Sequence, residues 1–464
     1  MGHGRAPIES PQRPRSFRDR IRAFRPLVQV VAFLSLFLLC ILSAFIVPIV
    51  PDYLRVNDTE IEIGALLAAN SIVAIFANPV AAFVTDRYGY QNPVVGGLLL
   101  YAAAAFVSAF AKEIASHDLT KTYVVLFVAR GIQGLGDAFA VVASLAMVAI
   151  WYTGDDERAK AMGNTFAAAG IGLVVGYPFG GAFSAVPGGI DAGWKWPFII
   201  TGLISLAAAL IALLMGSSPP GGGGERTSNG SAGPSMFRLL CDPYVAVCCL
   251  SLISTYSSLA FMEPLLPVWM KAKFHEPTPT TYSVGLILLA LTIAYTIGSL
   301  VYGRIPGERS YWLNALVSQI VVAACLALLP LVAIPSSRNL FYAIIPLFFM
   351  GLCYGVVDLV VSLVLGVVVE KRYAYTSYGG VYALVSTSFT ISFVVSPICG
   401  ATVAKYVHFN WAAWGLAIFI FATSFFLVFL RDMKGGAEEG ASSKAAVEPT
   451  EKTKLLSGSA ESSA

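Results

Sequence analysis

The chain has 464 residues, of which 57% are hydrophobic and only 12% are charged, and its formal net charge is +3. Soluble domains carry about 25% charged residues, so this composition excludes an ordinary soluble protein. The apolar residues fall into blocks of roughly 20 to 25, the length that an α-helix needs to cross a ~30 Å hydrocarbon core. The sequence therefore predicts an all-α membrane protein that crosses the lipid bilayer many times.

Twelve membrane-spanning helices are predicted. They lie near residues 27–50, 62–84, 92–111, 122–151, 160–186, 197–215, 243–270, 281–303, 311–334, 340–369, 377–405 and 410–430. A polar, Gly- and Pro-rich segment, 216–242, divides them into an N-terminal bundle, 27–215, and a C-terminal bundle, 243–431, each of six helices. Such a segment cannot bury enough apolar surface to fold, so it predicts a flexible linker.

The distribution of charge predicts the topology. Residues 1–26 are rich in arginine and residues 432–464 in Ala, Glu, Lys and Ser, and both predict disordered tails. The first apolar block is long enough to span, so it predicts a signal anchor rather than a cleavable signal peptide. Most of the 30 Lys and Arg residues lie in the tails, the linker and the loops on the same side. The positive-inside rule therefore predicts that both termini are cytoplasmic.

The two halves resemble repeats of one unit. Three short patterns recur in corresponding helices at a nearly constant offset: Pro48-x-x-Pro51 as Pro264-x-x-Pro267, Gly134-Leu-Gly-Asp137 as Gly355-Val-Val-Asp358, and Gly176-Tyr-Pro178 as Val395-Ser-Pro397. We interpret this as duplication of a six-helix unit. Transporters built in this way bind their substrate between the halves, near the middle of the membrane.

Four ionisable residues inside the predicted spans are candidates for substrate or proton binding, and they are Arg130, Asp137, Glu263 and Asp358. A charge at membrane depth costs at least a few kcal/mol, so it normally faces a cavity or a partner. Buried carboxyl groups can exchange protons near neutral pH, which favours Glu263 and Asp358 as proton sites. The structural alternatives are a neutral buried acid for Glu263, a helix–helix hydrogen bond for Asp358, and bonding to backbone carbonyls for Arg130.

Other chemistry finds little support in the sequence. The seven cysteines are scattered and the four histidines lie outside the predicted spans, so no metal site is expected. There is no nucleophile–base pair and no phosphate-binding loop, so an enzyme and a nucleic-acid partner are not expected. Protons are the only coupling ion that we predict, and we predict no cofactor.

Three motifs resemble signatures of the major facilitator superfamily. Asp86-Arg87-Tyr88-Gly89 follows the second span and resembles a loop in which an acid and a base latch neighbouring helix ends, with glycine permitting the tight turn. Arg130 to Asp137 resembles a span-4 motif whose arginine assists proton coupling. Gly172, Gly176 and Pro178 resemble an antiporter motif, in which small residues let helices pack closely and proline bends the helix; Tyr177 departs from it. The alternative for the loop at Asp86 is an ordinary polar turn, and the alternative for the glycine motif is plain helix packing.

A more specific resemblance covers residues 28–431. Val47-Pro48-Ile49-Val50-Pro51-Asp52-Tyr53, Met262-Glu263-Pro264-x-x-Pro267-x-Trp269, Tyr152 to Gly163, and Asp358 with Tyr378-Gly379-x-Val381-Tyr382-Ala383 resemble the vesicular amine transporters, which load monoamines or acetylcholine into secretory vesicles in exchange for protons. The resemblance implies the major facilitator fold of two six-helix pseudo-repeats. It also implies a monomeric, proton-coupled antiporter of an organic amine or other organic cation.

The same resemblance implies further site residues. Glu263, Asp358, Arg130 and Asp137 would serve substrate and protons, and Pro48 and Pro264 would support gating. Aromatic side chains could supply cation–π contacts or simply pack, and the candidates are Trp269, Tyr295 and Phe389.

The departures from the family pattern concern charge. Leu39 stands where the family has a first-span aspartate that contacts the amine. Asn70 and Ser386 stand where the family has a paired lysine and aspartate, and their joint loss leaves no orphan charge. The loss at Leu39 favours an alternative, a multidrug/H⁺ antiporter of the plasma membrane. A remoter alternative is a scaffold or sensor that has lost transport.

Two short signals concern location. Asn57-Asp58-Thr59 is a glycosylation sequon on the side opposite the termini. Glu451 with Leu455-Leu456 resembles an acidic dileucine signal, which clathrin adaptors read in the cytosol. With the family resemblance, this favours an intracellular vesicle or a lysosome- or vacuole-like membrane over the plasma membrane.

Overall fold

The computed structural model describes residues 25–46, 50, 53–54, 60–152, 154–184, 190–215, 236–273, 281–305, 310–333, 340–373 and 378–434. This part of the chain is almost entirely helical and contains no strand. Several predictions of the sequence lie outside it, namely those for the two tails, most of the linker, Pro48, Asn57 and the dileucine signal.

In the described residues of the N-terminal half there are six long helices and one short one. They are α2 (Arg25–Ala44), α4 (Glu60–Tyr88), α5 (Gln91–Ala109), α6 (Ala111–Ile114), α7 (Leu119–Trp151), α8 (Asp155–Ser184) and α9 (Ile190–Met215). The C-terminal half contains α10 (Met236–Leu240), α11 (Pro243–Lys273), α12 (Thr281–Arg304), α13 (Tyr311–Leu328), α14 (Ile344–Tyr373), α15 (Gly379–Val407) and α16 (Phe409–Ser424), with 3₁₀ segments η1 (Leu329–Ala333), η2 (Leu340–Ala343) and η3 (Phe425–Lys434).

The helices are long and apolar enough for a multi-pass membrane protein. Among the described residues, 11 helices meet the length and hydropathy of a membrane span, and α8 is one further long helix of 30 residues. Alanine and glycine make α8 less hydrophobic than its neighbours, which suits a helix that packs against protein on several sides. The predicted all-α membrane fold is therefore confirmed.

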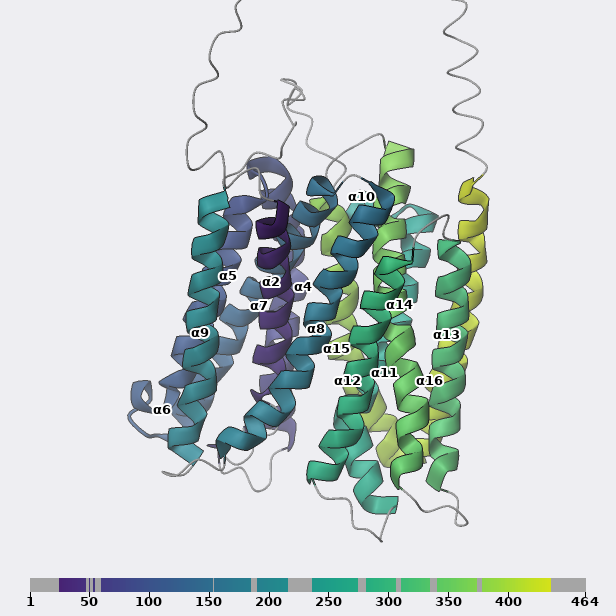
Figure 1. Cartoon of the computed structure of the whole chain (residues 1–464). Helices are drawn as coiled ribbons and strands as arrows, with labels where there is room; N and C mark the ends of the chain where they lie inside the picture. Colours follow the sequence, from purple (N-terminus) through teal and green to yellow (C-terminus); the bar gives the residue numbers. More distant parts are fainter. Residues whose placement is uncertain are drawn as a thin grey trace, which may run out of the picture.

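The two halves lie side by side, as Figure 1 shows from the purple-to-blue and the green-to-yellow helices. Within the first half α2 packs on α8, α5 on α9 and α4 on α7; within the second, α12 packs on α14 and α11 on α15. Contact between the halves comes mainly from α8 with α12 and from α4 with α15. We call the end at which α2, α8, α11 and α15 begin the upper end, which is uppermost in Figure 1.

Glycines bring α8 and α12 together across the halves. A Cβ atom placed on Gly163 would lie 2.6 Å from the carbonyl oxygen of Ser299, and one on Gly170 would overlap Thr296 and Tyr295. Gly172 and Gly176, from the predicted antiporter motif, instead face α2, where a Cβ atom would lie 2.7 Å from the carbonyl oxygen of Phe37 and 2.6 Å from the Ala44 Cβ. Small residues thus hold α8 against two neighbours at backbone distance.

The upper end is joined by polar contacts between the halves. The Asp86 carboxylate accepts hydrogen bonds from the backbone N–H groups of Gly379 at 2.8 Å and Gly380 at 3.3 Å. These groups lie at the N-terminus of α15, where unsatisfied N–H groups and the helix dipole favour an anion. Gly89, just after α4, has φ +92°, a left-handed conformation that favours glycine. Arg87 lies over the rings of Phe83 and Tyr88 instead of bonding to α15.

A second contact at the upper end is an ion pair. Arg158, near the start of α8, pairs with Glu370, near the end of α14, at 2.8 Å. The same guanidinium donates to the backbone carbonyl of Tyr152 at 3.1 Å. Together with the bonds from α15 to Asp86 of α4, this pair fastens the two halves at this end.

Candidate functional site

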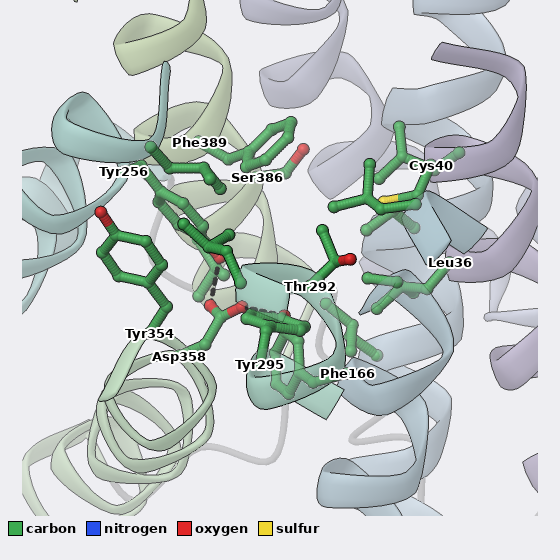
Figure 2. Close-up of a pocket in the computed structure, with 18 residues that line it drawn as sticks. Leu36, Cys40, Phe166, Tyr256, Thr292, Tyr295, Tyr354, Asp358, Ser386 and Phe389 are labelled. Atoms are coloured by element: carbon green, nitrogen blue, oxygen red, sulfur yellow. Dashed lines mark hydrogen bonds between the residues drawn. The ribbon is translucent and has the colours of Figure 1, made fainter. Parts of the chain in front are cut away.

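A cavity of about 70 Å³ lies between the two halves, near the middle of the helices (Figure 2). Its N-terminal wall consists of Leu36, Leu39 and Cys40 from α2, Val141 and Leu145 from α7, and Phe166, Ala169 and Leu173 from α8. Its C-terminal wall consists of Tyr256 and Leu259 from α11, Leu291, Thr292 and Tyr295 from α12, Tyr354 and Asp358 from α14, and Val385, Ser386 and Phe389 from α15. Typical small-molecule sites measure about 300–1,000 Å³, so this cavity is small for a ligand site.

Asp358 is the one charged side chain among these lining residues. It is only 3% exposed, and both of its carboxylate oxygens accept hydrogen bonds. The hydroxyl of Tyr256 donates to Oδ1, and the hydroxyl of Tyr295 donates to Oδ2 at 2.6 Å. Three helices, α11, α12 and α14, therefore meet at this carboxylate, as the dashed lines in Figure 2 show.

Glu263 lies outside the cavity lining, on α11. It is partly buried, and its Oε1 accepts a hydrogen bond of 2.5 Å from the hydroxyl of Tyr177 on α8. The structure thus separates the two acids that the sequence groups together: Asp358 lines the cavity, and Glu263 joins the halves. Pro264, the next residue, is exposed.

Arg130 and Asp137 form a third group, buried in the N-terminal half. Arg130 donates through Nη2 to Asn70 Oδ1 at 3.0 Å and to the Leu67 carbonyl at 3.2 Å, and through Nη1 to Gln133 Oε1 at 2.7 Å. Asn70 in turn donates through Nδ2 to Asp137 Oδ2 at 3.3 Å. The amide of Asn70 therefore bridges the guanidinium and the carboxylate. Neither of these charged residues lines the cavity.

Ser386 takes part in an uncharged link between α4 and α15. Its hydroxyl donates to Asn78 Oδ1 at 3.1 Å, and Asn78 Nδ2 donates to the Thr387 hydroxyl at 3.0 Å. Hydrogen-bonding side chains commonly join helices in membranes. Asn70 and Ser386, two of the positions that depart from the family pattern, thus serve different networks.

Two of the three predicted aromatic residues line the cavity. Tyr295 and Phe389 line the cavity, and Phe389 meets the Tyr256 ring edge-on at a centroid distance of 5.0 Å. Trp269 lies elsewhere: it stacks on Phe409 at 4.8 Å and donates to Asn410 Oδ1 at 3.2 Å.

Sequence analysis missed three tyrosines of this region. Tyr256 precedes Glu263 by two helical turns and Tyr354 precedes Asp358 by about one, so each lies on the same helix face as a predicted acid. That spacing could have indicated them. Tyr177 was visible only as a departure from the antiporter motif. Among the described residues, no group of three or more His, Cys, Asp or Glu could hold a metal ion.

Comparison with known sequences identifies relatives of this chain. The Major Facilitator Superfamily profile matches residues 32–379. The human chromaffin granule amine transporter is 31% identical over 75% of this chain and 61% of its own length. The vesicular acetylcholine transporter unc-17 of Caenorhabditis elegans is 32% identical over 80% and 65%, and the probable vesicular acetylcholine transporter-B of Danio rerio is 30% identical over 83% and 75%. The chain spans less than two thirds of the chromaffin granule amine transporters that it matches.

Solved structures show the same fold. The proton:xylose symporter XylE aligns with a TM-score of 0.69 over 86% of this chain and 94% of its own, at 12% identity. The human organic anion transporter MFSD10 aligns with a TM-score of 0.66 over 87% and 99%, also at 12% identity. The fold and the sequence relatives together show that the chain belongs to the major facilitator superfamily and, within it, to the vesicular amine and acetylcholine transporters, which are transporters and not enzymes.

Proposed function

We propose that this transporter is a proton-coupled antiporter of an organic amine or other organic cation. The observation that carries the proposal is Asp358, the charged group of a cavity between two halves, held by the hydroxyls of Tyr256 and Tyr295. A carboxylate at membrane depth is costly. A bound proton and a bound cation are alternative ways of neutralising it, so each would displace the other.

Glu263 supplies a second acid for protons. It lies at the contact between α8 and α11, so a change in its charge would affect a bond between the halves as well as a binding site. The positive charge of Arg130, in the N-terminal half, would influence how readily these two carboxyl groups bind protons. Its guanidinium is fixed by Asn70, Gln133 and a backbone carbonyl, which keeps this charge in one place.

Transport would require the halves to rock about the cavity. The contacts of Asp86 with α15 and of Arg158 with Glu370 close the upper end, and they would break when the site opens there. Gly172 and Gly176 pack α8 on α2, so α8 would move with the N-terminal half. Pro178 and Pro264 would let α8 and α11 bend.

We assign the upper end and both termini to the cytoplasm, from the excess of Lys and Arg on that side. A vesicle membrane is supported by the names of the relatives, which are vesicular or chromaffin granule transporters. The dileucine pair Leu455-Leu456 would direct the chain there through clathrin adaptors. The rival location, the plasma membrane, would suit a multidrug antiporter, which the apolar Leu39 on the cavity wall favours.

Reconstituted transport tests the proposal. Proteoliposomes with an acidic interior should accumulate labelled phenethylamine, serotonin or acetylcholine, and collapse of the gradient should release it. Asp358→Asn and Glu263→Gln should abolish accumulation, whereas Asp155→Asn, an exposed acid at the start of α8, should retain it. Gradient-driven uptake that survives in both the Asp358→Asn and the Glu263→Gln variant would overturn the mechanism.

A further inference from the structure

Each half of the molecule holds one buried aspartate that is built into its bundle in the same way. Asp137 lies near the middle of α7 and Asp358 near the middle of α14, the fourth long helix of each half, and each is only 3% exposed. A glycine precedes each of them by three residues, Gly134 and Gly355. These positions correspond in the internal sequence repeat, so the two aspartates are counterparts within a duplicated unit.

The two glycines bring the hydrogen-bond partner of each aspartate close. A Cβ atom on Gly134 would overlap the backbone carbonyl oxygen of Asn70 on α4. One on Gly355 would overlap the backbone carbonyl oxygen of Tyr295 on α12. In both halves the residue beside the glycine also donates a hydrogen bond to the aspartate, at 3.3 Å in the first half and 2.6 Å in the second. Because α4 and α12 are the second long helix of each half, the two acid sites follow one plan.

The Asp137 carboxylate is poorly compensated as an anion. Its Oδ2 accepts a hydrogen bond from Asn70, and its Oδ1 is buried without a partner in the described structure. The Arg130 guanidinium bonds to the oxygen of the same Asn70 amide, and none of the ion pairs of the described residues joins Arg130 to Asp137. A buried carboxylate without an ion pair is costly at membrane depth, and a bound proton removes that cost.

Three titratable groups of the described structure face this carboxyl group, namely Arg130 of its own helix, Tyr101 of α5 and Cys40 of α2. The Tyr101 hydroxyl is buried without a partner, so it can accept the O–H of a protonated Asp137. The positive charge of Arg130 favours the ionised acid, whereas burial favours the neutral acid. These opposing effects allow the group both to bind and to release a proton.

Asp137 lies behind the cavity wall and not on it. Val141, one turn later on α7, and Cys40 line the cavity, whereas Asp137 does not. Figure 2 shows Cys40 across the cavity from Asp358. Cargo in the cavity therefore contacts Asp358 directly and is separated from Asp137 by the side chains of the wall. The two acids share one plan but differ in whether cargo can neutralise them.

We propose that Asp137 is a proton-binding site of the N-terminal half that loads and releases its proton without competing with the cargo. The two related acids then have different tasks. Cargo displaces the proton of Asp358, and Asp137 carries a proton that the cargo leaves in place. Rocking of the halves changes the side of the membrane that the cavity faces, and this exchanges the proton of Asp137. The inference rests on the proposed function and adds a coupling site to it.

Infrared spectroscopy of the purified full-length chain in lipid tests the site directly. The C=O stretch of a protonated, buried carboxyl group gives a separate band, and loss of this band at alkaline pH reports deprotonation. We expect Asp137→Asn to remove one band from the wild-type pH-difference spectrum, and Asp358→Asn to remove another. Saturating phenethylamine should erase the Asp358 band and leave the Asp137 band. A spectrum that Asp137→Asn does not change, or an Asp137 band that phenethylamine erases, would overturn the inference.

Transport supplies a second readout in proteoliposomes, the number of protons moved per amine, obtained from phenethylamine accumulation over a series of pH gradients. Asp137→Asn should bind phenethylamine as wild type does but move one proton fewer per amine. Asp155→Asn, which neutralises an exposed acid at the start of α8, is the control and should keep both the bands and the ratio. If Asp137→Asn does not fold, Asp137→Ser removes the same carboxyl group with a smaller side chain. An unchanged ratio in a folded neutral variant would contradict the coupling role.

The inference and the proposed function can fail separately. If Asp137→Asn loses a band and a proton per amine, but phenethylamine leaves every wild-type band in place, the Asp137 site stands and competition at Asp358 is overturned. If phenethylamine erases the Asp358 band and the pH gradient drives uptake with the wild-type ratio in Asp137→Asn, the antiport stands and the Asp137 site is overturned.

Discussion

The hydroxyl of Tyr177 on α8 donates a 2.5 Å hydrogen bond to the carboxylate of Glu263 on α11, and the two residues belong to different halves. Each is followed directly by proline, Pro178 and Pro264. A proline removes a backbone hydrogen bond from its helix and favours a bend. The bond between Tyr177 and Glu263 therefore lies beside a proline on each helix, where a bend of either helix would affect it.

Replacement of Tyr177 by phenylalanine should impair coupling more than folding. The change removes one hydrogen bond to an acid, worth about 1.5–3 kcal/mol, and keeps the ring. We expect gradient-driven uptake to fall several-fold while binding of phenethylamine changes little. Tyr342→Phe, on the outer surface of η2, is the matched control and should transport normally. Wild-type uptake by Tyr177→Phe would show that the bond has no part in transport.

A methyl group at Gly163 should push the halves apart near the upper end. The new Cβ would lie 2.6 Å from the Ser299 carbonyl oxygen, and such overpacking costs about 1–3 kcal/mol. Gly163→Ala should therefore lower the melting temperature of the purified protein. Gly96→Ala provides the control, because no atom lies within 4 Å of the added Cβ, and it should leave the melting temperature unchanged or raised. Equal effects of the two changes would refute the close contact.

The pair between Arg158 and Glu370 should tolerate exchange of its charges better than loss of one. Glu370→Gln leaves a largely buried guanidinium without its carboxylate, whereas the double variant Arg158→Glu/Glu370→Arg restores opposite charges across α8 and α14. Arg158→Glu and Glu370→Arg each reverse one charge and should each reduce uptake, and we expect the double variant to recover part of that loss. Measurement of uptake by wild type, the two single reversals and the double variant gives the coupling energy between the two sites. Additive losses would mean that the pair does not act as a unit.

A pH effect on stability is expected at the lower end, where Lys195 pairs with Glu113 of α6. The hydrogen bond from Lys195 holds the pKa of Glu113 below its usual 4.5. A lowered native pKa stabilises the folded state at pH above the unfolded value, and this contribution disappears as pH falls through the native pKa. Because Glu113 is 39% exposed, the contribution is small, about 0–1 kcal/mol.

The melting temperature of Glu113→Gln, compared with wild type across pH, checks this effect. The variant should be slightly less stable near neutral pH, and the two proteins should converge as pH falls through the lowered pKa of Glu113. A stability difference that persists unchanged in acid would have another cause.

The sequence predicts this fold well because the bilayer constrains it so strongly. Apolar blocks of spanning length leave few alternatives to helices, even for α8 with its many small residues. The site is harder to predict. Spacing places Tyr354 and Asp358 on one face of α14, but it does not say which helix lies opposite. The rotation of neighbouring helices decides that Asp358 meets two tyrosines, that Asp137 meets Asn70, and that Trp269 packs on Phe409. That rotation is set by packing at residues such as Gly163, not by any local pattern.

The bonds of Asp86 to the first N–H groups of α15 bias the resting population of the transporter. Opening the upper end leaves these N–H groups without their carboxylate, at a cost of about 1–3 kcal/mol. A bias of that size corresponds to about 5- to 150-fold in favour of the closed upper end, before any proton or substrate binds. These bonds would thus favour an empty transporter that is sealed toward the upper side, and cargo entry from that side would require release of both the Asp86 carboxylate and the Arg158–Glu370 pair.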